Sequence, residues 1–173
     1  MRSPSMWAGK RRLRLRELLE LALLCALMFA FKEAMAVLPN IHPVLLLILL
    51  GVRVYGWRIL YSVFGFVLLE IGVYGAGLWT LVYLYIWPLA AVLALPFRQN
   101  GSRLFWAAFA GVFGLCFGAL CAIPYLFMGG WPMALSYWVA GIPFDLIHCV
   151  SNTVLVFVLL PPLVRLVTGL KNR

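Results

Sequence analysis

The sequence predicts an all-α integral membrane protein with six transmembrane helices and both termini in the cytoplasm. Three observations lead to this prediction. Of the 173 residues, 65% are hydrophobic and only 11% are charged, whereas soluble domains usually carry about a quarter charged residues. Apolar runs that approach the ~20 residues of a membrane-spanning helix recur along the chain. The net charge is +9, but lysine and arginine gather between alternate runs, which is typical of membrane topology.

Six apolar segments can be marked, and we expect each of them to form one helix. They cover residues 17–38, 41–52, 57–75, 78–97, 104–128 and 136–168. The second is short, so it is either tilted or joined to the third. In the long sixth segment we expect Pro143 to kink the helix near its start and the Pro161–Pro162 pair to break it near its end. The chain then divides into a basic cytoplasmic N-terminus (1–16), a six-helix membrane domain (17–168) and a cytoplasmic tail (169–173).

The basic residues set the orientation, because cytoplasmic connections are enriched in lysine and arginine. The N-terminal cluster "KRRLRLR" and the arginines of "GVRVYGWR" and "FRQNGSR" fall at every second connection. The opposite connections, "LPNIHP", "VYGAGLW" and "MGGWPMALSYW", contain neither lysine nor arginine. With six helices, only Lys32 of the 14 basic residues lies away from an inner end. A cleaved signal peptide ending at "AMA" is the alternative, but Lys32 and Glu33 just before that site fit it poorly.

A polar stripe marks the sixth segment, in the stretch "GIPFDLIHCVSN". Asp145, His148 and Asn152 are spaced i, i+3, i+7 and therefore share one helical face. Charged groups in hydrocarbon cost at least ~2.5 kcal/mol each on insertion scales, so they persist where they face a cavity or each other. We interpret the stripe as one wall of a ligand pocket open to the outside, with Asp145 as its strongest contact; hydrogen bonding between helices is the alternative. With the other polar and aromatic residues of the outer half, the candidate substrate-binding set is Asn40, His42, Glu70, Trp79, Tyr83, Tyr125, Trp138, Asp145, His148 and Asn152.

No catalytic constellation accompanies this pocket. The sequence has no arrangement that resembles a triad, and neither HExxH nor GxxxxGK[ST] occurs in it. We therefore expect no enzymatic activity, no metal and no cofactor, and any uptake would take its energy from a partner or a gradient. The basic start carries no nucleic-acid motif, so no nucleic-acid partner is expected. The four cysteines lie within apolar runs without a CxxC pair, and we interpret them as small buried hydrophobic residues.

Two stripes of small residues can bring helices close together in lipid. The first, in "ALLCALMFA", consists of Ala22, Ala26 and Ala30; the second, in the fifth segment, consists of Ala110, Gly114, Gly118 and Ala122. One stripe suffices for internal packing. We therefore expect the other to contact another subunit, and the alternative is that both serve internal packing.

The chain resembles the substrate-binding (S) components of energy-coupling factor (ECF) vitamin transporters. The resemblance covers almost the whole chain and is carried by "ALLCALMFA", "LPNIHPV", "FVLLEIGVYGAGLWTLVYLYIWPL" and "GIPFDLIHCVSN". It implies a multi-pass protein of a prokaryotic cell membrane that binds a vitamin or a related small heterocyclic micronutrient. It also implies docking of Ala22, Ala26 and Ala30 onto a transmembrane coupling subunit that sits on two ATPase subunits, and toppling in the membrane to deliver the substrate.

The residues themselves leave the substrate open. Carboxylates, a histidine and aromatic rings suit a flat heterocycle that donates hydrogen bonds or carries positive charge. Thiamine or its pyrimidine precursor, pyridoxine, a benzimidazole nucleoside and a deazaguanine base all qualify, whereas a purely anionic substrate fits less well, although Lys32 could serve one. Two other functional classes stay open. One is a solitary gradient-driven carrier, whose expected internal repeats we do not find, and the other is a non-transporting membrane scaffold subunit.

Overall fold

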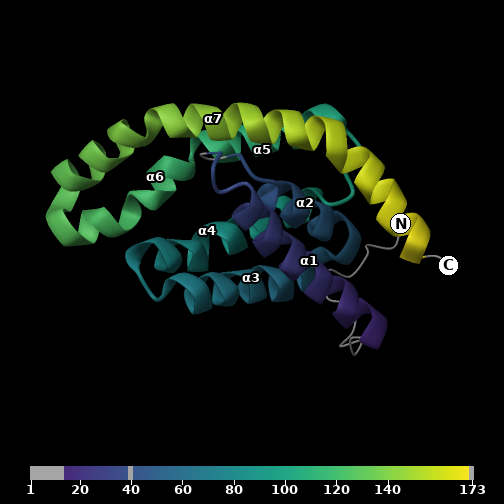
Figure 1. The fold of residues 1–173 in the computed structure, drawn as a ribbon. Coiled ribbons are helices and arrows are strands. Elements are labelled where there is room, and N and C mark those ends of the chain that lie inside the picture. Colours follow the sequence, from purple (N-terminus) through teal and green to yellow (C-terminus); the bar gives the residue numbers. More distant parts are fainter. Residues whose placement is uncertain (1–13, 39–40, 172–173) are drawn as a thin grey trace.

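The computed structural model describes residues 14–38 and 41–171, and its regular elements are all helices (Figure 1). The α-helices are α1 (Leu15–Ala34), α2 (Val44–Tyr55), α3 (Ile59–Tyr74), α4 (Leu78–Ala94), α5 (Arg103–Leu115), α6 (Phe117–Cys121) and α7 (Ile123–Lys171). Two short 3₁₀ helices, η1 (Gly56–Arg58) and η2 (Leu95–Phe97), follow α2 and α4. The helical fold class predicted from the sequence is therefore confirmed for the described part of the chain. The basic cluster before Arg14 and the candidate residue Asn40 lie outside it.

Three stretches are long and apolar enough to cross a membrane, namely Val44–Tyr74, Leu78–Phe97 and Ile123–Lys171. Helix α5 is apolar but shorter. Helix α1 has 20 residues, but charged side chains occupy both of its ends: Arg16, Glu17 and Glu20 at the start, and Lys32 and Glu33 near the end. Helices of this length and composition are compatible with a membrane location.

Ion pairs at the two ends of α1 show that α1, α2 and α3 run in alternating directions. Near the start of α1, Glu17 pairs with Arg58, which directly precedes α3. Near its end, Lys32 pairs with Glu70 in the last turns of α3, so α1 and α3 run parallel and α2 runs back between them. The chain reverses at Gly56, whose φ of 62° is readily adopted only by glycine. The apolar stretch from α2 through α3 is therefore two helices rather than one continuous span.

Helix α2 lies at the centre of the fold. Every residue from Val44 to Val52 is buried, and α1, α3, α4 and α7 all pack against it. Its 12 residues are few for a membrane crossing. Because α2 is surrounded by other helices, its apolar residues are covered by protein on all sides. The short second segment of the sequence is thus explained by burial.

The fifth and sixth predicted segments form a long helical hairpin. The fifth is divided among α5, α6 and the first turns of α7, and α7 then runs back beside α5 and α6 (Figure 1). The reversal lies at Gly129 and Gly130, the positions within α7 whose backbone is not helical. Gly130 has a φ of 71°, which again favours glycine. The predicted connection "MGGWPMALSYW" is too long, because the residues after Gly130 are already helical.

The prolines do not interrupt the sixth segment as predicted. Helix α7 continues through Pro143, and it also continues through Pro161 and Pro162 to Lys171, so the predicted break near its end is wrong. A proline removes one backbone hydrogen bond of the helix. In helices of membrane proteins such a loss is tolerated when local adjustments or neighbouring groups satisfy the freed carbonyl. The glycine pair ends the first part of α7 instead, since it allows the chain to turn.

The two stripes of small residues have opposite environments. The stripe on the fifth segment is buried, and its members are Ala110, Gly114, Gly118 and Ala122. A Cβ atom on Gly114 would lie 2.8 Å from backbone atoms of His148 and Cys149, so this stripe allows α7 to approach closely. The stripe on α1 is exposed along its length, at Ala22, Ala26 and Ala30. Internal packing therefore accounts for the stripe on the fifth segment but not for the stripe on α1.

Candidate ligand-binding site

A hollow of about 220 Å³ lies beside the end of α1. The last turn of α1, the loop that follows it, the start of α4, the start of α6 and the middle of α7 all contribute to its wall. It is lined by the side chains of Lys32, His42, Trp79, Tyr83, Phe117 and His148, and by Met35, Ala36 and Leu38. Aromatic and imidazole rings thus form much of the wall, as is usual for sites that bind small organic molecules.

His148 is a deeply buried polar residue of this wall. It lies on α7 and is 3% exposed. Its ring meets that of Phe117 edge-on at a centroid distance of 4.6 Å, and that of His42 at 5.5 Å. His42 in turn contacts the ring of Trp87 at 6.0 Å. The long-range packing of α4, α6 and α7 therefore joins two imidazoles and two aromatic rings in one cluster.

Several buried polar atoms at this site have no hydrogen-bond partner among the residues that the structure describes. They are Nδ1 of His42, Nε1 of Trp87 and both ring nitrogens of His148. More than nine in ten buried polar groups in proteins are hydrogen-bonded, and an unpaired one costs about 1–3 kcal/mol. Three of these atoms belong to His42 and His148, which line the hollow, and Trp87 packs against the ring of His42, so the concentration is unusual. A ligand with matching donors and acceptors would satisfy them.

An ion-pair network borders the hollow on the side of α1. Lys32 Nζ lies 2.8 Å from Glu70 Oε2 and 3.2 Å from Glu33 Oε1. The same ammonium lies 6.0 Å from the centroid of the Tyr83 ring, within the range of a cation–π contact. Tyr74 donates a hydrogen bond to Glu33. Because two carboxylates neighbour one ammonium group, the charge of Lys32 is already compensated.

His42 lies in the loop before α2, outside the helical spans. Burial, assisted by the nearby Lys32 ammonium, lowers the pKa of His42 to about 4. Its imidazole is therefore neutral at pH 7 and offers one hydrogen-bond donor and one acceptor. A ligand that approaches this ring meets a hydrogen-bonding group rather than a charge.

The polar stripe predicted on the sixth segment is confirmed as one buried face of α7. Asp145, His148 and Asn152 are 4%, 3% and 6% exposed, respectively. Their environments differ, however. Asp145 Oδ1 accepts a hydrogen bond of 2.8 Å from the backbone N–H of Gly118, near the start of α6, and Asp145 does not line the hollow. This contact joins α6 to α7.

The residues predicted for the site fall into three groups. His42, Trp79, Tyr83 and His148 line the hollow together. Glu70 is fully buried and borders it through Lys32. The remaining described residues of the set lie elsewhere: Asp145 against Gly118, Asn152 deeper along α7, Tyr125 stacked on Tyr137 at 4.1 Å, and Trp138 40% exposed.

Sequence reasoning did not include three residues that build the site. Trp87 could have been found, because Trp79, Tyr83 and Trp87 follow each other at steps of four on one face of α4. Lys32 was considered only for an anionic substrate. Phe117 gives no such signal, since it stands among small residues of the second stripe. Its place in the wall depends on the start of α6 and on the approach of α7.

No family model, no curated protein and no solved structure matches this sequence. The function must therefore be argued from the geometry of the chain itself. In the part of the chain that the structure describes, no group of three or more His, Cys, Asp or Glu side chains could hold a metal ion.

Proposed function

We propose that this chain is the substrate-binding subunit of an uptake system for a vitamin or a related small heterocyclic micronutrient, similar to the S components of ECF transporters. The observation that carries the proposal is the unpaired polar atoms of His42 and His148, two residues that line a hollow walled by aromatic rings. Groups that are buried without partners favour a ligand that pairs with them.

The same atoms define the chemistry of the ligand. A neutral imidazole, as in His42, supplies one donor and one acceptor, so the ligand needs both kinds of group. The aromatic walls favour a flat ring system. A volume of about 220 Å³ is below the usual ~300–1,000 Å³ of pockets for drug-sized ligands, which favours a molecule of one or two rings. Because Glu33 and Glu70 compensate Lys32, a neutral or cationic ligand fits better than an anion.

The exposed alanine stripe supports a partner protein. Ala22, Ala26 and Ala30 are solvent-accessible in the isolated chain, and small residues at steps of four allow the backbone of another helix to approach closely. We therefore propose that α1 docks onto a transmembrane coupling subunit, which two ATPase subunits energise. The sequence contains no GxxxxGK[ST] motif with which this chain could use ATP itself.

We further propose that the chain crosses a prokaryotic cell membrane six times, with both termini in the cytoplasm. The alternating directions of the helices support this topology. The basic side chains support it too, since Lys32 lies beside the hollow while Arg16, Arg53, Arg58 and Lys171 gather at the other end of α1. The ligand hollow would then open toward the outside.

Native mass spectrometry of the protein purified from cells grown in rich medium tests the ligand directly. We expect a retained small molecule with one or two rings that carries both hydrogen-bond donors and acceptors. Binding of that molecule should be weakened by Trp79→Ala. The matched control is Trp131→Ala, because Trp131 is 67% exposed at the tip of the hairpin and outside the hollow.

Two results would contradict the proposal. Equal binding by both tryptophan variants would mean that the ligand does not occupy this hollow. Uptake by vesicles that contain the purified chain alone, driven by an ion gradient, would show a solitary carrier instead of a subunit.

A further inference from the structure

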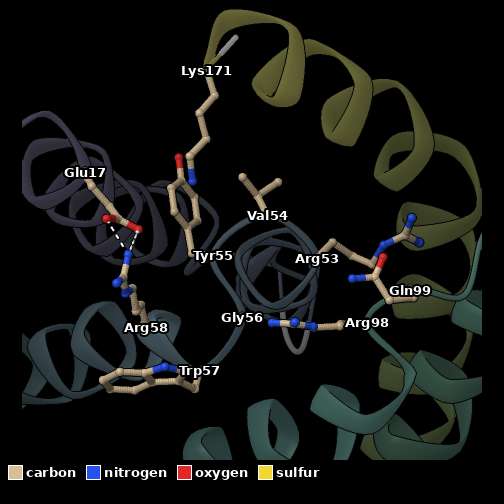
Figure 2. A pocket seen from close by; sticks show the side chains of 10 residues that line it. All are labelled: Glu17, Arg53, Val54, Tyr55, Gly56, Trp57, Arg58, Arg98, Gln99 and Lys171. Carbon is tan, nitrogen blue, oxygen red and sulfur yellow. Dashed lines mark hydrogen bonds and ion pairs between the residues drawn. The ribbon is translucent and has the colours of Figure 1, made fainter. Parts of the chain in front are cut away.

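A second hollow, of about 350 Å³, lies at the opposite end of α1 from the ligand-binding site (Figure 2). Glu17 of α1 lines it, whereas Lys32 of the same helix lines the first hollow. Fifteen residues of helix separate these two positions, or about 22 Å. The second hollow is therefore a separate site. Its wall comes from the start of α1, the end of α2, η1, the connection after η2 and the end of α7.

The charges around this hollow are strongly unbalanced. Figure 2 shows four cationic side chains around it, from Arg53, Arg58, Arg98 and Lys171, whereas Glu17 supplies the one carboxylate among the lining residues. Three positive charges in the lining, on Arg53, Arg98 and Lys171, thus form no ion pair with the residues that the structure describes. Like charges held close together repel each other, so an anion in the hollow would be stabilised.

The basic groups differ in how far they are already engaged. Arg58 binds Glu17 with two N–O distances of 2.7 and 2.6 Å. Arg53 donates to the carbonyl of Asn100 at 2.5 Å. Lys171 lies over the ring of Tyr55, 4.5 Å from its centroid.

The side chain of Arg98, by contrast, forms no hydrogen bond or ion pair with the residues that the structure describes. Its guanidinium lies against Gly56, where a Cβ atom would come within 2.6 Å of Nη1. Gly56 thus turns the chain after α2 and also leaves space for this side chain. A guanidinium with no side-chain partner among the described residues can bind a planar or tetrahedral oxyanion through several N–H groups at once.

The surface next to the hollow favours an amphipathic ligand. Trp57 lines the hollow and is 55% exposed, and its ring lies 5.7 Å from that of Tyr61. Along α3 the exposed apolar side chains of Tyr61, Phe64 and Leu68 follow at steps of three and four and so share one face. Tryptophan and tyrosine are enriched where a protein meets lipid headgroups. A basic cavity therefore continues into an exposed apolar surface.

We propose that this second hollow binds a phosphate-bearing anion, and that the headgroup of an anionic phospholipid is the source that its surroundings favour. The phosphate binds in the hollow at the Arg98 guanidinium, Arg53 and Lys171 add positive charge from other parts of the wall, and the acyl chains follow the exposed face of α3. Basic pockets between helices on the cytoplasmic side of membrane proteins bind such headgroups. This site is distinct from the hollow for the transported ligand and does not depend on that ligand's identity.

The experiment compares two pairs of substitutions in the full chain, purified in detergent and stripped of lipid. The double variant R98Q/K171Q removes two charges from the hollow, and neither side chain makes an ion pair there. The control R103Q/R165Q removes two charges from exposed arginines that do not line the hollow. Short-chain phosphatidylglycerol, short-chain phosphatidylcholine and glycerol 3-phosphate are each titrated while thermal stability is measured, and retained lipid is counted by native mass spectrometry.

We expect phosphatidylglycerol to stabilise the unsubstituted chain and the control alike, and to bind R98Q/K171Q about tenfold or more weakly, since each basic residue contributes to headgroup attraction. Equally tight binding of glycerol 3-phosphate would identify a soluble phosphate compound as the source and would leave the site in place. An equal loss in both double variants would overturn the proposal, because a diffuse positive surface would then explain the attraction. Absence of any preference over phosphatidylcholine, with no binding of glycerol 3-phosphate, would overturn it as well.

Discussion

His148 is a buried side chain that lowers the stability of the fold but is available for ligand binding. Its imidazole is packed between the rings of His42 and Phe117, and neither of its nitrogens has a hydrogen-bond partner. Each unpaired buried group costs about 1–3 kcal/mol. Because the hollow reaches this ring, a bound ligand recovers that energy. His148 therefore serves the proposed ligand recognition and does not stabilise the ligand-free protein.

The variant His148→Phe tests this interpretation. Phenylalanine keeps a ring of similar size but removes both nitrogens, so we expect ligand affinity to fall about ten- to hundredfold. The thermal stability of the empty protein should stay the same or increase, because two unsatisfied groups are lost. Calorimetry and thermal unfolding in the same detergent measure both quantities. Lower stability with unchanged affinity would mean that the imidazole serves packing alone.

Asp145 requires a different test, because it joins helices beside the hollow. Asp145→Ala leaves the Gly118 N–H without its acceptor and should lower stability by about 1–3 kcal/mol. Asp145→Asn retains an amide oxygen in that place, so we expect a smaller loss of stability and a smaller loss of affinity than for His148→Phe. Thermal unfolding and calorimetry of the two variants check these expectations. A larger loss of affinity in Asp145→Asn would show direct contact with the ligand, as the sequence alone had indicated.

At the scale of elements, the close approach of α5 and α6 to α7 positions the wall of the site. Glycines on α5 and α6 bring the backbone of α7 near enough for Asp145 to reach Gly118, whose added Cβ would lie 2.4 Å from Asp145 Oδ2. The same approach places His148 beside Phe117. Small residues on one helix thereby determine where polar residues of another helix can lie.

Substitution of Gly114 by alanine should separate these helices. The added Cβ would lie 2.8 Å from backbone atoms of His148 and Cys149, which cannot move without a shift of α7. Overpacking of this kind costs about 1–3 kcal/mol, so we expect a lower unfolding temperature and weaker ligand binding. Gly141→Ala is the matched control, since no atom lies within 4 Å of its added Cβ. Equal losses from both substitutions would show that contact with α7 is not responsible.

The exposed stripe of α1 makes a separate prediction. Ala26→Trp should abolish ligand uptake by cells that contain the proposed coupling module, because a bulky ring prevents close approach of a partner helix. Ligand binding by the purified variant should be unchanged, since Ala26 is exposed and distant from the hollow. Ala108→Trp, at an exposed alanine of α5, serves as the control for uptake. If Ala26→Trp also loses ligand binding, the stripe contributes to the fold of the chain itself.

At the scale of the whole molecule, the helices connect two chemically different ends. One end holds the ring-lined hollow and the compensated Lys32, and the other holds the second hollow with its excess of positive charge. Arg16 Nη2 donates to the carbonyl of Leu170 at 2.5 Å, so the first turn of α1 and the last turn of α7 meet at the basic end. This difference between the ends supports the proposed orientation in a membrane.

Cysteine labelling of intact cells tests that orientation. In a background without the four native cysteines, Ala76→Cys should react with an impermeant maleimide added outside, and Gly101→Cys should not. Both positions are exposed and lie in connections at opposite ends of the fold, so they form a matched pair. Labelling of Gly101→Cys alone would invert the topology, and labelling of both would contradict the proposed crossings.

The local pattern of the sequence determined the helical class, the turn at "VYGAGLW" and the common face of Asp145, His148 and Asn152. These features depend on helical periodicity and on glycine, which act over a few residues. The break predicted at Pro161–Pro162 failed because a proline in a helix can be accommodated by its surroundings, which the sequence does not reveal.

Only the tertiary structure decided which polar residues meet. His42 and His148 are 106 positions apart in the printed sequence, and Arg98 and Lys171 are 73 apart, yet each pair lines one hollow. Helix packing also decides that His148 lines the hollow while Asp145 does not. It likewise decides that α2 is buried on all sides. A local pattern specifies the face of each helix, but the partner of that face is set by close packing among all of them.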